Sequence, residues 1–118
     1  MKVCVIDDDA LVLEHIAGEL ADLGHDVLTA ADADAGMRLI EQERPDAVVV
    51  DILMPDRDGL TLIMEARPYR DQMRIVAITG GGMLGATPVL QMASGLGAHA
   101  VLVKPFTAEA LQRALQPA

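Results

Sequence analysis

The sequence predicts an α/β protein in which helices cover both faces of a parallel sheet. Five short apolar runs alternate with five segments of helical periodicity, and no linker, repeat or low-complexity stretch interrupts the 118 residues. The most apolar run, Val48–Val50, is entirely β-branched, as in a buried strand, and it stops abruptly at Asp51. We therefore expect one domain over residues 1–118, with right-handed crossovers between its strands.

Each expected strand is a short apolar run that closes on a polar or turn-forming residue. In chain order, the strands are predicted at Lys2–Ile6, His25–Ala30, Ala47–Asp51, Arg74–Thr79 and Ala100–Val103. The third run is followed by Met54-Pro55, which breaks the strand pattern, and then by Asp58-Gly59, which signals a turn before the next helix.

The helices between these strands are bounded by capping residues. Candidate N-caps are Asp9, Asp32 and Thr87, the last followed by a proline in the first turn. The expected helices run from Asp9 to Leu23, from Asp32 to about Glu43, from Gly59 to Arg67, from Thr87 to about Leu96 and from about Thr107 to Leu115. Gly24 and Gly97 lie where left-handed residues end helices. Residues expected to face the core are Leu11, Leu13, Ile16, Leu20 and Leu23 in the first helix and Leu60, Leu62, Ile63 and Met64 in the third.

The composition restricts the possible partners and the cellular setting. A formal net charge of −9 argues against direct binding to nucleic acid or to an anionic membrane. The single cysteine, Cys4, falls inside the first apolar run and reads as a buried core residue. No signal peptide or bilayer-spanning run is visible, so we expect a cytoplasmic protein.

Polar groups follow four of the five expected strands. Asp7 and Asp8 follow the first, Asp51 closes the third, Thr79 closes the fourth and Lys104 follows the fifth. Ligands gather at the carboxyl edge of a parallel sheet. Clustered carboxylates stay ionised when a cation offsets their repulsion, and oxygen-only ligands favour magnesium. A lysine and a threonine hydroxyl suit phosphoryl oxygens, so Asp51 could be a covalent phosphoryl acceptor.

Each of these residues also has an ordinary structural explanation. The acidic run at residues 7–9 could be a solvated helix-capping cluster, Thr79 a plain strand-end threonine and Lys104 a surface lysine. Their joint occurrence at one edge of the sheet favours phosphoryl transfer over a set of unrelated coincidences.

This ordered set of motifs resembles the receiver domain of two-component response regulators over the whole chain. The motifs are Asp7-Asp8, Asp51 in Asp-Ile-Leu-Met-Pro-Asp-Arg-Asp-Gly, Thr79, and Lys104-Pro105-Phe106. The resemblance implies a flavodoxin-like, three-layer fold of five strand–helix units with strand order 2-1-3-4-5. It also implies a signalling switch that catalyses only its own phosphorylation and dephosphorylation, rather than an enzyme with a separate substrate.

By this resemblance, Asp51 accepts a phosphoryl group from a histidine kinase or a phosphotransfer protein. Mg²⁺ would be held by Asp8, Asp51 and the backbone carbonyl of Leu53, with Asp7 acting largely through water. Lys104 would pair with a phosphoryl oxygen.

The resemblance further implies that Thr79 moves to hydrogen-bond the phosphoryl group and that contacts change on the face formed by the fourth helix, fifth strand and fifth helix. The family usually has an aromatic residue three positions before the lysine, and here that position is Val101, so the usual aromatic readout cannot operate. Residues 75–103 contain no Asp, Glu, Lys or Arg. We expect this uncharged region to contact a downstream protein or a second copy of the chain.

Two other functions stay open. A hydrolase that uses Asp51 as nucleophile would commonly have a second carboxylate two residues later, where this chain has Leu53. The other is a degenerate receiver that binds partners without phosphorylation. The retained acids, Thr79 and Lys104 argue against this alternative, whereas the absence of the usual aromatic residue at Val101 leaves it possible. Because the sequence stops just after the last helix, we expect a stand-alone receiver without an attached output domain.

Overall fold

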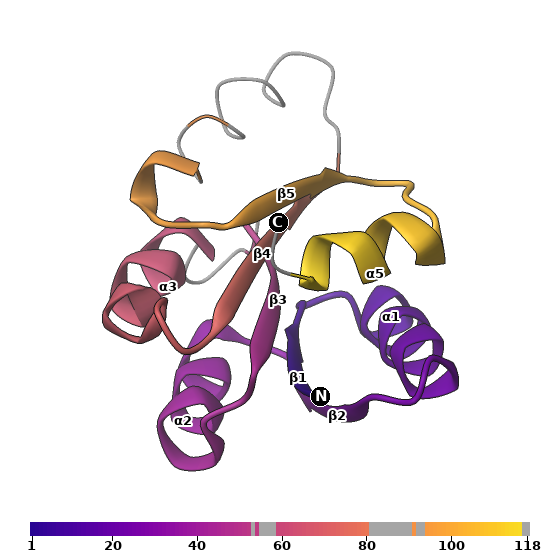
Figure 1. The fold of residues 1–118 in the computed structure, drawn as a ribbon, viewed down its shortest axis with the longest axis horizontal. Helices are drawn as coiled ribbons and strands as arrows, with labels where there is room; N and C mark the ends of the chain where they lie inside the picture. Colours follow the sequence, from indigo (N-terminus) through magenta and orange to yellow (C-terminus); the bar gives the residue numbers. More distant parts are fainter. Residues whose placement is uncertain (53, 55–58, 81–90, 92–93, 117–118) are drawn as a thin grey trace.

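The structure is a computed structural model that describes residues 1–52, 54, 59–80, 91 and 94–116. Five parallel strands form one sheet in the order β2-β1-β3-β4-β5 (Figure 1). The strands are β1 (Lys2–Ile6), β2 (Asp26–Ala30), β3 (Ala47–Asp51), β4 (Arg74–Thr79) and β5 (Ala100–Val103). The predicted sheet and its order are confirmed, and among the strands only β2 differs from its expected bounds, beginning one residue later.

Helices lie on both faces of this sheet. They are α1 (Ala10–Asp22), α2 (Ala33–Glu43), α3 (Gly59–Ala66), a short 3₁₀ helix η1 (Arg67–Tyr69) and α5 (Ala108–Leu115). In Figure 1, α2 and α3 cover one face, whereas α1 and α5 cover the other. The predicted caps Asp9 and Asp32 accept hydrogen bonds from backbone N–H groups in the first turns of α1 and α2. The helix expected from Thr87 to about Leu96 lies largely outside the described residues.

Strand side chains alternate between two cores because successive residues of a strand point to opposite faces. On β1, Cys4 and Ile6 pack toward α2 and α3, whereas Val3 and Val5 pack toward α1 and α5. β3 is buried along its whole length. Strand β3, which ends in Asp51, is thus fixed by packing on both faces and by hydrogen bonds to β1 and β4 on both edges.

Three side chains that we expected to face the core point outward, among them Leu23 just after the first helix, which is 45% exposed. Leu11 is 78% exposed and Met64 is 55% exposed. At about 100° per residue, Leu11 lies roughly half a turn away from the buried Leu20, nine residues later. Met64 likewise falls outside the stripe that Leu62 and Ile63 fill. Periodicity predicted the helices correctly, but not which apolar residues each helix would bury.

Candidate functional site

The predicted polar residues meet at the carboxyl edge of the sheet. Asp7 follows β1, Asp51 ends β3, Thr79 ends β4 and Lys104 follows β5. Strands β1, β3, β4 and β5 are consecutive neighbours and all run in one direction, so their ends are brought together. The topology therefore assembles in space a site whose members are up to 97 residues apart in sequence.

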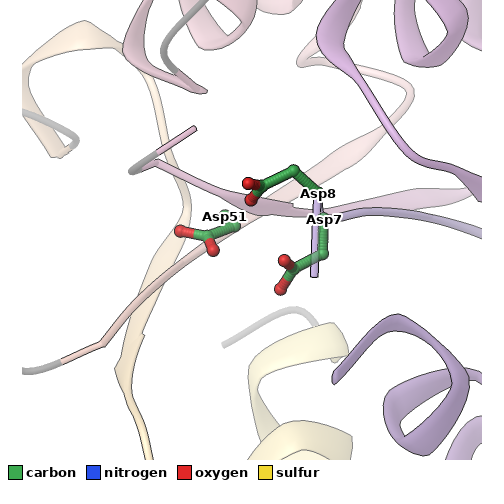
Figure 2. A group of neighbouring side chains, drawn as sticks. All are labelled: Asp7, Asp8 and Asp51. Carbon is green, nitrogen blue, oxygen red and sulfur yellow. The ribbon is translucent and has the colours of Figure 1, made fainter. Parts of the chain in front are cut away.

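Three carboxylates form the acidic part of the site. Figure 2 shows Asp7, Asp8 and Asp51 extending from the ends of β1 and β3 into one region. One oxygen from each lies within 4.8 Å of the others. Asp7 and Asp51 are buried, whereas Asp8 is exposed and gives the cluster a side open to solvent.

Lys104 joins two of these acids. Its Nζ donates to Asp7 Oδ2 at 3.2 Å and to Asp51 Oδ2 at 3.3 Å. Its backbone N–H donates to the carbonyl oxygen of Thr79 at 2.8 Å, which fixes the start of the β5–α5 connection against the end of β4. The ammonium group is therefore held beside the Asp51 carboxylate by two independent sets of contacts.

The charges and donor atoms of the site fit a hard divalent cation. Among the described residues, the cluster brings together three carboxylates and one ammonium group, and every candidate ligand atom in it is an oxygen. Oxygen-only sites with carboxylates suit Mg²⁺ or Ca²⁺. The exposed Asp8 leaves room for the water molecules that such ions keep.

Backbone hydrogen bonds extend the sheet into the site. The N–H of Asp7 donates to the carbonyl oxygen of Ala30, and that of Ile52 to the carbonyl oxygen of Ile78, so β1 and β3 stay paired one residue beyond their formal ends. The N–H of Asp9 donates to Asp7 Oδ1 at 2.9 Å. One oxygen of Asp7 is thereby used to hold the side chain in place, and the other faces Lys104.

Gly59 lets α3 begin directly against the end of β3. A Cβ at this position would lie 2.3 Å from the carbonyl oxygen of Asp51 and 2.6 Å from the Cα of Ile52. Both atoms belong to backbone and cannot move aside cheaply. The sequence placed Gly59 in a turn and at the start of a helix, but its close approach to Asp51 is visible only once the strand and the helix are placed together.

Burial and charge perturb two groups of the site in the same direction. Burial, with a contribution from the charge of Asp51, raises the pKa of Asp7 above its ordinary value, although the Asp9 amide and Lys104 oppose this shift. For Lys104, burial alone would lower the pKa, but attraction to Asp51 and Asp7 holds it above its ordinary value. Lys104 therefore remains a cation throughout the physiological pH range.

The remaining site predictions fall in different environments. Thr79 is 1% exposed at the end of β4. Val101 is partly buried on β5 and packs against the core on the α2–α3 face. Leu53 and, within the expected uncharged region, residues 81–90 and 92–93 lie outside the described residues.

An apolar groove opens beside Lys104, on the α1 side of the site. Its volume is about 280 Å³, and it lies between α1 and the segment that leads into α5. It is lined by Leu11, Val12, His15, Ile16, Glu19, Lys104, Pro105 and Phe106. The outward-facing Leu11 is part of this groove and gives it an exposed apolar rim.

Comparison with known proteins assigns the chain to a family. A family model described as the response regulator receiver domain matches residues 3–116. The chain therefore belongs to the response regulator receiver domain family, as the resemblance implied.

Its relatives include longer proteins. The response regulator MprA of Mycolicibacterium vanbaalenii is 35% identical over 113 residues, which are 94% of this chain and 47% of that protein. A probable transcriptional regulator, ycf27, of Guillardia theta is 33% identical over 111 residues, which are 94% of this chain and 42% of that protein. The chain spans less than half the length of these relatives, so the expected stand-alone organisation stays a prediction.

Solved structures show the same fold. A receiver domain protein from Clostridium thermocellum has a TM-score of 0.87 and is 32% identical, covering 97% of this chain and 90% of that chain. A response regulator from Burkholderia pseudomallei, solved with a phosphorylated aspartic acid, a calcium ion and citrate, has a TM-score of 0.87 and is 28% identical, covering 98% of this chain and 66% of that chain.

Membership defines the general role of the chain. Receiver domains of response regulators are signalling modules that histidine kinases phosphorylate, rather than enzymes with a separate substrate. Among the described residues, none of the helices has the length and apolar character that crossing a membrane requires. The expected cytoplasmic location and the absence of direct nucleic-acid binding stay predictions.

Proposed function

We propose that Asp51 is the phosphoryl acceptor of this receiver and that the donor is a phosphohistidine on a histidine kinase or a phosphotransfer protein. The observation that carries this proposal is the contact of Lys104 Nζ with Asp51 Oδ2 inside a three-carboxylate cluster. In the transfer, the P–N bond of the donor breaks and a P–O bond to Asp51 forms. The donor imidazole leaves with the electron pair of the broken bond.

The residues around Asp51 divide the work of this transfer. Lys104 lies on the acceptor carboxylate and would pair with an equatorial oxygen of the incoming phosphoryl group, where negative charge is concentrated. Thr79 ends the neighbouring strand and would supply a hydroxyl donor to a second oxygen. Because Asp51 is buried, little water competes with the incoming phosphoryl group for these donors.

A divalent cation, Mg²⁺ in the proposed reaction, would be held by Asp8, Asp51 and the carbonyl of Leu53, with Asp7 acting through water. When bound, it supplies positive charge to the transferring phosphoryl group. The three clustered carboxylates and the all-oxygen donor set support this assignment. The calcium ion and phosphorylated aspartic acid of the Burkholderia pseudomallei protein support it by similarity.

The apolar groove beside Lys104 is where we place the donor protein. A phosphohistidine must come within bonding distance of Asp51, so the surface around it must approach the open side of the site. The groove shares Lys104 with that site and carries the exposed side chain of Leu11 at its rim. Its shape and polarity suit the apolar face of a donor helix that carries the phosphohistidine.

The response to phosphorylation would reach partner proteins through the face formed by β5, α5 and the helix before β5. Val101 offers no ring that could swing between an outward and an inward position, so the readout here must rely on displacement of the backbone around β5. Val103, 39% exposed on the same strand, provides apolar contact area for a downstream protein or a second copy.

Intact-mass analysis with acetyl phosphate tests the acceptor and the metal together. Wild type should gain one phosphoryl group in Mg²⁺ and none in EDTA, and Asp51→Asn should gain none. Asp22→Asn removes an exposed carboxylate at the end of α1 and should label like wild type. A wild-type chain that neither labels nor binds beryllofluoride would identify a degenerate receiver. Labelling that persists in Asp51→Asn would move the acceptor elsewhere.

A further inference from the structure

His99 lies at the amino ends of the strands, opposite the end of the sheet that carries Asp51, and bonds to β4 just before β5 begins. Its backbone N–H donates to the carbonyl oxygen of Ile75 at 2.7 Å. In return, the N–H of Ile75 donates to Nδ1 of the His99 imidazole at 2.9 Å. Both backbone polar groups of one β4 residue are thus satisfied by a single residue that precedes β5.

The imidazole takes the place of a strand carbonyl. The β4–β5 pairing begins at Val76 and Ala100, so Ile75 lies one residue before the first paired position. Just upstream, Gly97 has a φ of +126°, which turns the chain, and its carbonyl oxygen accepts from Nε of Arg70 instead. The side chain of His99 supplies the acceptor at this point, where the regular ladder has not yet started.

This contact requires a particular protonation state. Nδ1 can accept from Ile75 only while it carries no proton, so the ring must be neutral with its proton on Nε2. Protonation would turn the acceptor into a second donor facing the N–H of Ile75. That N–H would then lose its partner at a partly buried position.

The surroundings disfavour the charged ring. Burial, together with the positive charges of Arg70 on one side and Arg74 on β4, lowers the pKa of His99, and the Asp71 carboxylate and a backbone hydrogen bond at Arg70 oppose this shift. A groove at this end of the molecule is lined by His99 together with Met1, Asp46, Arg70, Asp71 and Arg74. The charged side chains that share this groove with His99 are therefore two arginines and two carboxylates.

We propose that His99 is a pH-sensitive clamp that attaches the start of β5 to β4 only while its imidazole is neutral. β5 has four residues and lies at the edge of the sheet, so each anchoring contact matters. Its other end is held by the Lys104 N–H on the carbonyl oxygen of Thr79. Acidification therefore releases the strand at the end remote from Asp51 and leaves the phosphorylation site attached.

The direction of the pH effect follows from proton linkage. The folded chain binds this proton less readily than the unfolded chain, in which the histidine has its ordinary pKa of 6.5. The clamp contributes its full stability above the pKa of the unfolded chain. This contribution is lost as the pH falls through the pKa of His99 in the folded chain, which is lower. The titration should be local to the β4–β5 junction, because the hydrogen bond at risk belongs to Ile75.

Hydrogen exchange of the Ile75 amide, measured between about pH 5 and pH 8, tests the clamp. His99→Asn is the matched variant, because an Asn side-chain oxygen can occupy the acceptor position and does not titrate. Dividing the wild-type exchange rate by the variant rate at each pH cancels the intrinsic pH dependence of exchange. This ratio should be near one at the alkaline end and rise on the order of tenfold at the acidic end.

Two further measurements keep the proposal decisive. His15→Asn, which removes an exposed histidine on α1, should leave the pH profile of the Ile75 amide unchanged. In the wild-type chain, ¹⁵N chemical shifts of the His99 ring should show an unprotonated Nδ1 at neutral pH and a titration midpoint below 6.5. A flat exchange ratio would overturn the proposal. If His99→Asn did not fold, a proton on Nδ1 of the wild-type ring at neutral pH would overturn it instead.

Discussion

Replacing Lys104 by methionine removes the only ammonium group that the described residues place against the acidic cluster. The two side chains have similar lengths, so the change isolates the charge. In the absence of metal, Asp7 and Asp51 would then lose their contacts with this ammonium group. We expect this variant to be markedly less stable in EDTA than the wild type, with Mg²⁺ restoring part of the loss.

The size of the loss can be worked from the contacts. At an effective dielectric constant of about 20, opposite charges 3.2 Å apart attract by roughly 5 kcal/mol before desolvation is subtracted. Removing one partner of a buried ion pair costs about 3–5 kcal/mol. Because 23% of the Lys104 side chain remains exposed, we expect the lower end, about 3 kcal/mol, or a fall in Tm of roughly 10 °C.

Urea unfolding in EDTA and in Mg²⁺ measures both parts of this prediction. The matched control is Lys2→Met, which breaks a pair with Glu43 whose side chains are 35% and 43% exposed, and which should cost under about 1 kcal/mol. Mg²⁺ should stabilise the Lys104 variant more than wild type, because no ammonium group competes for the carboxylates. A loss in EDTA no larger than that of Lys2→Met would refute the electrostatic argument.

Three other predictions concern the site, the core and the groove. Gly59→Ala should lower the free energy of unfolding in urea by about 1–3 kcal/mol and slow acetyl phosphate labelling, because its Cβ would strike the backbone of Asp51. The control Gly18→Ala, whose Cβ meets nothing within 4 Å, should be neutral or stabilising in the same measurement. Burial raises the pKa of Cys4 to about 12, so a thiol reagent at mildly alkaline pH should label it in denaturant and not in the folded chain; labelling of the native chain would contradict its burial. Leu11→Glu should slow transfer from a phosphohistidine protein and leave acetyl phosphate labelling unchanged; equal slowing of both would argue against the groove as the donor site.

Most of the fold could be predicted from the sequence because the strands are unambiguous. Their β-branched runs admit little else, and the alternation with capped helices leaves a parallel sheet as the natural arrangement. The strand order came from the family resemblance and was confirmed. The orientation of single side chains was less predictable: Leu11 and Met64 satisfy a helical apolar pattern, and only the position of each helix against the sheet decides which side is buried.

Contacts between distant backbone segments were not predictable at all. Nothing in the local sequence indicates that Gly59 lies on the carbonyl group of Asp51, or that His99 bonds to a residue 24 positions earlier. Likewise, the guanidinium of Arg44 lies 4.5 Å from the centre of the Tyr69 ring. Each of these features depends on how two elements meet, which a one-dimensional pattern does not record.

The position of β3 in the sheet has a mechanical consequence. The strand that carries Asp51 is flanked by neighbours on both sides and packed on both faces, whereas β5, which leads to Lys104, has a neighbour on one side only. The sheet therefore constrains the strand that ends in Asp51 more than the edge strand that leads to the lysine. If Asp51 is phosphorylated as proposed, we expect the added charge to displace β5 more readily than β3.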